Sequence, residues 1–158
     1  IQKGVAKMDY AEGRVGRVFT VRVDHGEDLI AVLNSFSRKK GIQCAMAQFL
    51  GALSEGRVVT GPERAVLPPS PHFEGFDGGW EIFGTASIFP GNDGPVIHIH
   101  TSAGRGRDSL TGCLREVAEA YIVVEVFIIE FVGLAAFKTP EEKTGLKLPS
   151  FRQERSDR

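Results

Sequence analysis

The sequence is poor in cysteine, nearly neutral in charge and without long apolar runs. Its two cysteines, Cys44 and Cys113, are too few for a disulfide scaffold, so each is expected to be a free thiol or a metal ligand. The formal net charge of -1 excludes a strongly basic surface that would attract nucleic acid or anionic membranes by its overall field. Any such partner would need a local basic patch.

Two further absences concern the location of the protein. No apolar run reaches the roughly 18 residues that a membrane span requires. The first residues, IQKGVAKMDY, lack the apolar stretch of a secretion signal, so we expect a cytoplasmic protein with no membrane partner. Because the chain begins at Ile1 rather than at methionine, a targeting segment upstream of it stays an open alternative.

The chain does contain enough apolar residues for one domain, since 42% of its 158 residues are hydrophobic. Residues 17–23, RVFTVRV, alternate in the manner of a half-buried strand. A helix is predicted over the next segment, 24–41. Asp24 is its expected N-cap, Glu27 stands in capping-box position, and Gly41 can end the helix in a left-handed conformation.

Apolar or alternating runs indicate further strands at 42–53, 56–62, 80–89, 96–102 and 109–114. Prolines and glycines are dense over 61–79, which indicates an irregular connection. A turn signal at 92–95 lies between two predicted strands, so we expect a hairpin there.

The most apolar segment is 117–137, which is rich in β-branched and aromatic residues. Three glutamates within it argue against a membrane span, so it predicts one or two long antiparallel strands in the heart of a sheet. Further on, Thr139 as N-cap, Pro140 at the first helical position and Glu142 as capping-box partner predict a single helical turn. These elements predict an α/β domain.

Two histidines lie one residue apart in a predicted strand. Alternate side chains of a strand point to the same face, with α-carbons roughly 6.5 to 7 Å apart, so His98 and His100 can bind the same ion. Cys113 follows after a glycine-containing loop whose length suits an adjacent antiparallel strand. A His-His-Cys donor set favours zinc and leaves one coordination position open. The alternative interpretation is that the histidine pair binds no metal and that Cys113 is a buried, inert side chain.

The other two histidines, His25 and His72, are expected on the surface.

The run Gly-Arg-Gly-Arg over 104–107 is similar to the core of an AT-hook, which binds the minor groove of DNA. Asp108 stands where a hook has proline, flanking basic residues are missing, and the run lies between two predicted strands. We therefore expect a solvated hairpin loop. Its Arg105 and Arg107 offer bidentate forks for a small anion at the mouth of the metal site.

The segments GRVFTVRVDHGEDL, FLGAL, WEIFGTASI, GPVIHIHTSAGRGRDSLTGCL and KTGLKLPSF resemble, in this order, the plants and prokaryotes conserved domain (PPC, or DUF296). The resemblance covers residues 14–151. It implies an α/β fold of the α+β type, with a mainly antiparallel β-sheet and flanking helices in a single compact domain that usually assembles as a homotrimer. Residues 1–13 are then an N-terminal segment, and 152–158 a polar tail that we expect to be disordered.

The resemblance also bears on the histidine pair. Family members that resemble this chain can hold a metal, with zinc expected, at a His-x-His pair and a third histidine. His98 and His100 match the pair, and the third position falls on Cys113, which is itself a possible zinc ligand. In plants the domain accompanies AT-hooks in nuclear DNA-binding proteins, whereas prokaryotic members usually stand alone without hooks.

Three functions are therefore hypotheses. The first is a homotrimeric, zinc-binding PPC-domain protein of undefined biochemical role, in small-molecule binding or assembly. The second is a DNA-binding or transcription-associated protein, which the net charge of -1 disfavours. The third is a metal-dependent hydrolase or lyase with Glu116 or Asp108 as general base, although the sequence carries no established catalytic motif for it.

Overall fold

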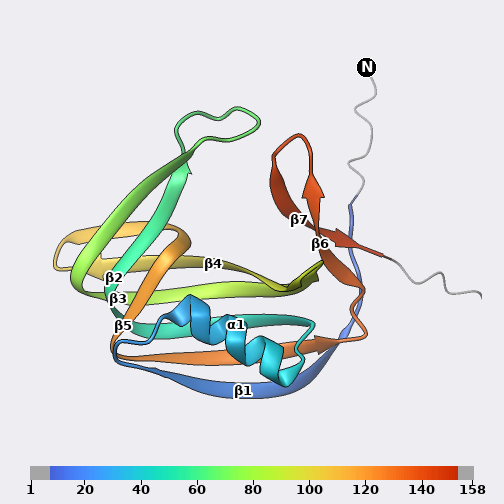
Figure 1. The fold of residues 1–158 in the computed structure, drawn as a ribbon, viewed down its shortest axis with the longest axis horizontal. Helices are drawn as coiled ribbons and strands as arrows, with labels where there is room; N and C mark the ends of the chain where they lie inside the picture. The colour runs from blue at the N-terminus through green and yellow to red at the C-terminus, as the bar shows by residue number, and fades with distance from the viewer. Residues whose placement is uncertain (1–7, 153–158) are drawn as a thin grey trace, which may run out of the picture.

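Antiparallel strands make up most of the fold in the computed structural model, which describes residues 8–152. The elements are β1 (Arg14–Asp24), α1 (Leu29–Lys40), β2 (Cys44–Pro62), β3 (Pro71–Gly91), β4 (Gly94–Arg105), β5 (Asp108–Val132), β6 (Ala136–Glu141) and β7 (Leu146–Phe151). The first five strands form one sheet in the order β1-β5-β2-β3-β4, and β6 and β7 form a separate hairpin. Figure 1 shows α1 lying across the sheet and the β6–β7 hairpin standing at one end of it.

The mainly antiparallel sheet in a single domain is as predicted from the sequence, but the expectation of several flanking helices is wrong. Within residues 8–152, α1 is the only helix of the fold. It packs its buried residues Leu29 and Leu33 onto the inward side chains of the sheet, among them Phe49 and Ile88. No helix in this part of the chain has the length and apolarity that a membrane crossing requires.

The sheet closes on itself through β5. The second half of this strand pairs with β1, and its first six residues pair with the end of β4. Strand β2 runs along most of β5 on its other edge. One long strand thus joins the segment predicted at 109–114 to most of the segment predicted at 117–137, whose last two residues belong to β6. This closure brings β4, which carries both histidines of the pair, beside the residue Cys113 of β5.

The predicted hairpin joins β3 and β4 through a turn at Asn92 and Asp93. The irregular connection predicted over 61–79 is much shorter, because β3 begins at Pro71. Gly78 and Gly79 lie inside this strand with φ of +80°, at a bulge where its register with β2 shifts. These glycines therefore mark a bulge in a strand, which local sequence does not distinguish from a loop.

The helix begins later than predicted. Asp28 is the N-cap, and its Oδ1 accepts a hydrogen bond of 2.7 Å from the Ala31 N–H. Its Oδ2 accepts a second bond of 2.8 Å from the Ala118 N–H of β5. The predicted N-cap Asp24 is the last residue of β1, and Glu27 Oε2 accepts from its N–H at 2.8 Å. The side chain of Glu27, which stands in capping-box position relative to Asp24, thus closes the turn before the helix.

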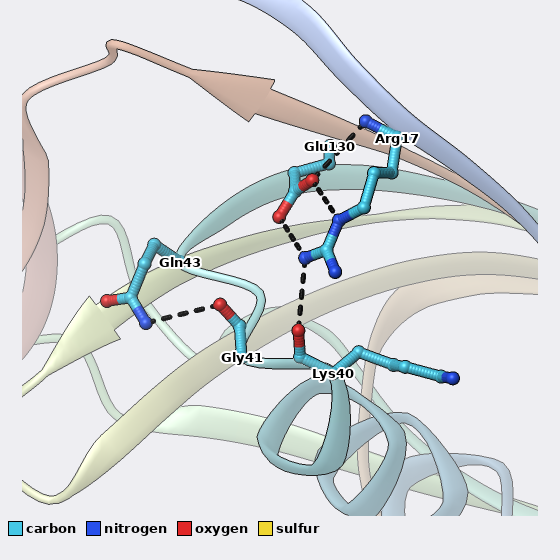
Figure 2. Close-up of polar contacts among 5 residues, drawn as sticks. All are labelled: Arg17, Lys40, Gly41, Gln43 and Glu130. Carbon is cyan, nitrogen blue, oxygen red and sulfur yellow. Dashed lines mark hydrogen bonds and ion pairs between the residues drawn. The ribbon is translucent and has the colours of Figure 1, made fainter.

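The end of the helix is where the sequence predicts it, at Gly41, which has a φ of 64°. Figure 2 shows how a partly buried ion pair reaches this end. Arg17 of β1 donates to both carboxylate oxygens of Glu130 on β5, at 2.7 and 2.6 Å. The same guanidinium donates at 3.0 Å to the carbonyl of Lys40. This carbonyl lies at the helix terminus, where it has no hydrogen-bond donor within the helix. The pair therefore joins two strands to the end of α1.

The helical turn predicted at Thr139 is wrong, because Thr139 and Pro140 lie in β6 and pair with β7. The carboxylate of Glu141 accepts from the N–H of Thr144 at 2.9 Å and closes the hairpin turn. An acidic side chain that binds backbone N–H groups serves a turn as well as a helix start. Residues 1–7 of the predicted N-terminal segment, and 153–158 of the tail predicted to be disordered, lie outside the described residues.

Candidate metal centre

The histidine pair projects from one face of β4. Ile99 is 2% exposed in the core and Ile97 packs against it, so the alternate residues His98 and His100 point the other way. Their rings lie 4.9 Å apart between centroids and are nearly perpendicular, at 88°. The strand thus holds two imidazoles close enough to share one ion.

The third donor comes from the neighbouring strand. Cys113 of β5 is directly opposite His100 in the β4–β5 ladder, and a turn at Gly106 and Arg107 connects the two strands. The candidate ligand atoms of His98, His100 and Cys113 all lie within 4.8 Å of one another. No fourth histidine, cysteine or carboxylate among residues 8–152 belongs to this cluster.

The donor set fits a zinc ion. Tetrahedral bonds of about 2.0 Å to nitrogen and 2.3 Å to sulfur put neighbouring ligand atoms roughly 3.3 to 3.6 Å apart. Small side-chain rotations bring three atoms that lie within 4.8 Å to that spacing. Two nitrogens and one sulfur are donors that zinc accepts, and the fourth tetrahedral position is left for water or a ligand.

The surroundings hold the imidazole of His98 in the neutral form that binds metals. Its pKa is lowered to about 4, first because the ring is partly buried, and then because of positive charge at His100, Lys138 and Arg115. Burial raises the pKa of the Cys113 thiol, and Arg115 and Lys138 act in the opposite direction. A bound cation deprotonates such a thiol.

Two basic residues beside the cluster are not predicted from the sequence. Lys138 of β6 is only 7% exposed, and its ammonium has no hydrogen-bond or ion-pair partner among residues 8–152. Its Nζ lies 5.9 Å from the centre of the Phe89 ring, and burial lowers its pKa. Arg115 of β5 is partly buried and follows Cys113 by two positions. The only local signal is a lysine on the buried side of the short strand that begins at Ala136.

A pocket of about 630 Å³ lies next to the cluster, where β4 and β5 separate. Beyond His100 towards its start, β4 no longer pairs with β5. We call the cavity in this gap the β4–β5 pocket. Its walls come from α1, β3, β4, β5 and the β6–β7 hairpin, with the residues Ile30, Ser87, Phe89, Val96, Ile97, His98, Ile99, Leu114, Arg115, Glu116, Lys138, Leu146, Lys147, Leu148 and Pro149.

The other predicted site residues lie elsewhere. Arg105 and Arg107 are at the hairpin turn, and Arg105 is five residues along β4 from His100, about 17 Å away. Arg105 donates to the carbonyl of Asp77 at 3.3 Å. The expectation that these arginines bind an anion at the mouth of the metal site is therefore wrong in its geometry. Asp108 lies opposite Arg105, at the same distant end.

The remaining histidines and the second candidate base have partners of their own. His25 is exposed, and its Nδ1 accepts from the Ile122 N–H at 3.2 Å. His72 Nδ1 lies 2.7 Å from a carboxylate oxygen of Glu63. Both are on the surface, as expected. The carboxylate of Glu116 lines the β4–β5 pocket but forms an ion pair with Arg57.

The fold and the sequence of this chain are both similar to those of known proteins. A protein described as metal-containing, from Archaeoglobus fulgidus, has a solved structure with 25% identity and a TM-score of 0.79, covering 89% of this chain and 98% of its own. A plant- and prokaryote-conserved (PPC) protein from Pyrococcus horikoshii has 22% identity and a TM-score of 0.72, with 91% and 96% covered.

A third solved structure, from Bacteroides thetaiotaomicron, is provisionally described as a DNA-binding protein. It has 23% identity and a TM-score of 0.70, with 90% of this chain and 99% of that chain covered. No curated protein matches this sequence. The model of the Plants and Prokaryotes Conserved domain, abbreviated PCC or PPC, matches residues 10–132. The chain therefore belongs to the Plants and Prokaryotes Conserved domain family.

Proposed function

We propose that this protein is a zinc-binding PPC-domain protein in which His98, His100 and Cys113 hold the ion. The observation that carries the proposal is the convergence of these three donors, from two adjacent strands, within 4.8 Å. The likeness to a protein described as metal-containing supports it. Cys44 and Cys113 are both free thiols, which fits the reducing, cytoplasmic location that we propose.

Anomalous diffraction tests this proposal. Crystals of protein purified without chelators, measured on both sides of the zinc absorption edge, should show a peak between the two imidazoles and the thiol that appears only above the edge. A peak at another position, or none, contradicts the assignment of the ligands.

The open coordination position is proposed to take a small anionic ligand. A zinc ion carries positive charge, and Lys138 and Arg115 add two more positive side chains beside His98. Such a group of cations attracts an anion far more than a neutral molecule in a partly dehydrated pocket. The biochemical role that we propose is therefore binding of a small molecule at the metal.

Self-association as a homotrimer is also proposed, and an apolar stripe on the outer face of the sheet supports it. Four exposed side chains, at Val18, Leu50, Phe83 and Phe127, come from four neighbouring strands. Leu50 and Phe83 are direct cross-strand partners, and Phe127 and Val18 continue the row diagonally. Contiguous apolar surface of this kind is typical of an interface between subunits.

A DNA-binding function is the second candidate, and one observation favours it: a structurally similar protein carries that provisional description. The net charge of -1 and the absence of an AT-hook in the sequence oppose autonomous binding to duplex DNA. Fluorescence anisotropy with an AT-rich duplex at low salt decides the matter. Affinity that falls steeply as salt is added supports the candidate, and its absence removes it.

The hydrolase or lyase hypothesis requires a general base within hydrogen-bond reach of the metal-bound water or substrate. The two bases expected from the sequence do not meet this requirement in the described chain. Glu116 is held by Arg57, and Asp108 lies at the far hairpin turn. We therefore propose binding rather than catalysis.

A further inference from the structure

The β4–β5 pocket contains a buried lysine that has no anionic partner. Lys138 is 93% shielded from solvent, since its exposed fraction is 7%. Its ammonium keeps some contact with solvent, because Ser37 Oγ is the only fully buried side-chain polar atom without a partner among residues 8–152. A charge that is so largely dehydrated is still costly unless an opposite charge or several acceptors compensate it. Because Lys138 has neither among residues 8–152, its charge is open to a partner from solution. The pocket is the route by which such a partner reaches it.

The balance of charge in the pocket selects an anion. Arg115 and Lys147 line it together with Lys138, whereas Glu116 is the single carboxylate in its wall. This carboxylate is already neutralised by the guanidinium of Arg57. The pocket therefore holds an excess of positive charge, even before any metal is considered.

The remaining walls are apolar and select what the anion is attached to. Side chains from five elements form them, including Ile30 of α1, Phe89 of β3 and Val96 of β4. Leu146 and Leu148 on the β7 strand are 48% and 37% exposed, so they gain from being covered. The volume of about 630 Å³ is in the range of pockets that hold whole small molecules.

We propose that the β4–β5 pocket binds a monocarboxylate with an apolar body, whose carboxylate pairs with Lys138 and whose body lies against the leucines of β7. The inference rests on the proposed anionic ligand of this protein and gives it a chemical class. It does not rest on the metal, because Lys138 and the apolar walls belong to the chain itself. Lys138 and His98 both line this pocket, so a carboxylate paired with Lys138 lies near the proposed zinc.

Titration with hexanoate, followed in two-dimensional amide NMR spectra, tests this inference. Hexanoate should shift the amide signals of β4, β5 and β7 residues around the pocket and saturate. The neutral analogue hexanamide, with the same apolar body, should bind at least about tenfold more weakly, because it cannot pair with the ammonium. Equal binding of the two compounds, or no saturable shift with hexanoate, overturns the proposal.

Two pairs of variants localise the binding. Lys138→Met should weaken hexanoate binding at least about tenfold, whereas Lys143→Met, in the exposed turn of the same hairpin, should leave it unchanged. At the pocket rim, Leu148→Asp should weaken binding strongly and the isosteric Leu148→Asn only slightly. This second pair is on an exposed position and keeps the test valid if Lys138→Met fails to fold. Unchanged affinity in folded Lys138→Met or in Leu148→Asp overturns the proposal.

Two further arms separate the ligand class and the metal. Inorganic phosphate should bind more weakly than hexanoate, and equal affinity would show that the apolar body contributes nothing, which overturns the assigned class. Hexanoate should bind both to the protein as purified and after treatment with a chelator. Binding that disappears on chelation overturns the role of Lys138 as a sufficient anchor. If the protein as purified contains no zinc and still binds hexanoate, this inference stands and the proposed metal is refuted.

Discussion

At the scale of single residues, the candidate metal centre depends on Cys113. Its side chain is buried opposite His100, so a ligand at this position can reach the ion without leaving the ladder between the strands. The sulfur of cysteine binds zinc about 0.2 to 0.3 Å farther away than the nitrogen of histidine, but it bears a negative charge when it does so. The site therefore gains charge neutralisation from Cys113 that a third imidazole does not provide.

Replacement of Cys113 distinguishes a zinc ligand from a buried side chain that only packs against its neighbours. We expect Cys113→Ser to lower the affinity for zinc by more than tenfold, because a serine hydroxyl is a poor zinc ligand at neutral pH. Cys113→His should retain binding, since imidazole is an accepted donor. Competition with a chromogenic chelator measures both affinities. Unchanged affinity in Cys113→Ser would show that the thiol is only a packed side chain.

The convergence of His98, His100 and Cys113 could be predicted from the sequence because their geometry is local. A spacing of two on a strand fixes a common face, and a short connection between antiparallel strands fixes which residues are opposite. Lys138 could not be predicted, since it reaches the cluster only when the β6–β7 hairpin packs back onto β3. Arg105 and Arg107 were misplaced because β4 continues as an extended strand to Arg105, three residues beyond the predicted end at 102, and so carries the turn away from the histidines.

At the scale of elements, Asp28 links the start of α1 to β5. One oxygen caps the helix and the other binds the N–H of Ala118. We expect Asp28→Ala to lower the free energy of unfolding by about 2 kcal/mol, because a lost cap costs about 1 kcal/mol and a second hydrogen bond is lost as well. Denaturation with urea measures the change.

Asp24→Ala is the matched control for this prediction. Asp24 was the expected N-cap, but its side chain pairs only with the exposed Arg22. The substitution should change the free energy of unfolding by less than about 0.5 kcal/mol. An equal or larger loss in Asp24→Ala would show that the helix begins where the sequence pattern predicts it.

The ion pair between β1 and β5 gives the fold a dependence on acid. The pKa of Glu130 lies below its ordinary value of 4.5, first because Arg17 hydrogen-bonds its carboxylate. Since the pKa is depressed in the folded state, the stabilisation is fully present above the unfolded value and is lost as pH falls through the folded value. We expect Glu130→Gln to be less stable than the unsubstituted protein at pH 7, with a difference that narrows below about pH 4.5.

Thermal unfolding of both proteins between pH 7 and pH 3 measures this difference. A gap in melting temperature that stays constant down to pH 3 contradicts the ion pair as its source.

The ion pair is also an example of a contact that local sequence does not predict. Arg17 and Glu130 are 113 residues apart in the chain, and the bond from Arg17 to the carbonyl of Lys40 depends on their meeting. The C-cap Gly41, by contrast, is a local signal and was predicted correctly.

For the other elements too, features with a local sequence signal could be predicted, and features that depend on pairing with a distant segment could not. The hairpin of β3 and β4 was predicted because its turn and alternation are local. The start of β3 was missed because Gly78 and Gly79 are read as a loop, whereas pairing with β2 makes them a bulge. Thr139 was placed in a helical turn because its helix-start pattern is equally suited to the hairpin that β7 imposes.

At the scale of the whole molecule, the closure of the sheet leaves one apolar stripe on its outer face. We expect the protein to sediment at about three times its chain mass of 17.2 kDa, with this stripe between subunits. Phe83→Asp should dissociate the assembly, because it puts a charge at the most exposed position of the stripe. Sedimentation equilibrium measures the mass of the unsubstituted protein and of the Phe83→Asp variant.

Val66→Asp is the control for the assembly, since Val66 is exposed in the connection between β2 and β3 and lies outside the stripe. It should leave the mass unchanged. A monomeric unsubstituted protein contradicts the proposed trimer, and a trimer that survives in Phe83→Asp places the interface elsewhere.

The zinc content of the protein purified without chelators, determined by elemental mass spectrometry, tests the proposed metal centre. We expect about one zinc ion per chain. We also expect the double variant His98→Ala, His100→Ala to contain none while it stays folded. A protein that carries no stoichiometric zinc, or a folded double variant that keeps it, would show that His98 and His100 do not hold a zinc ion.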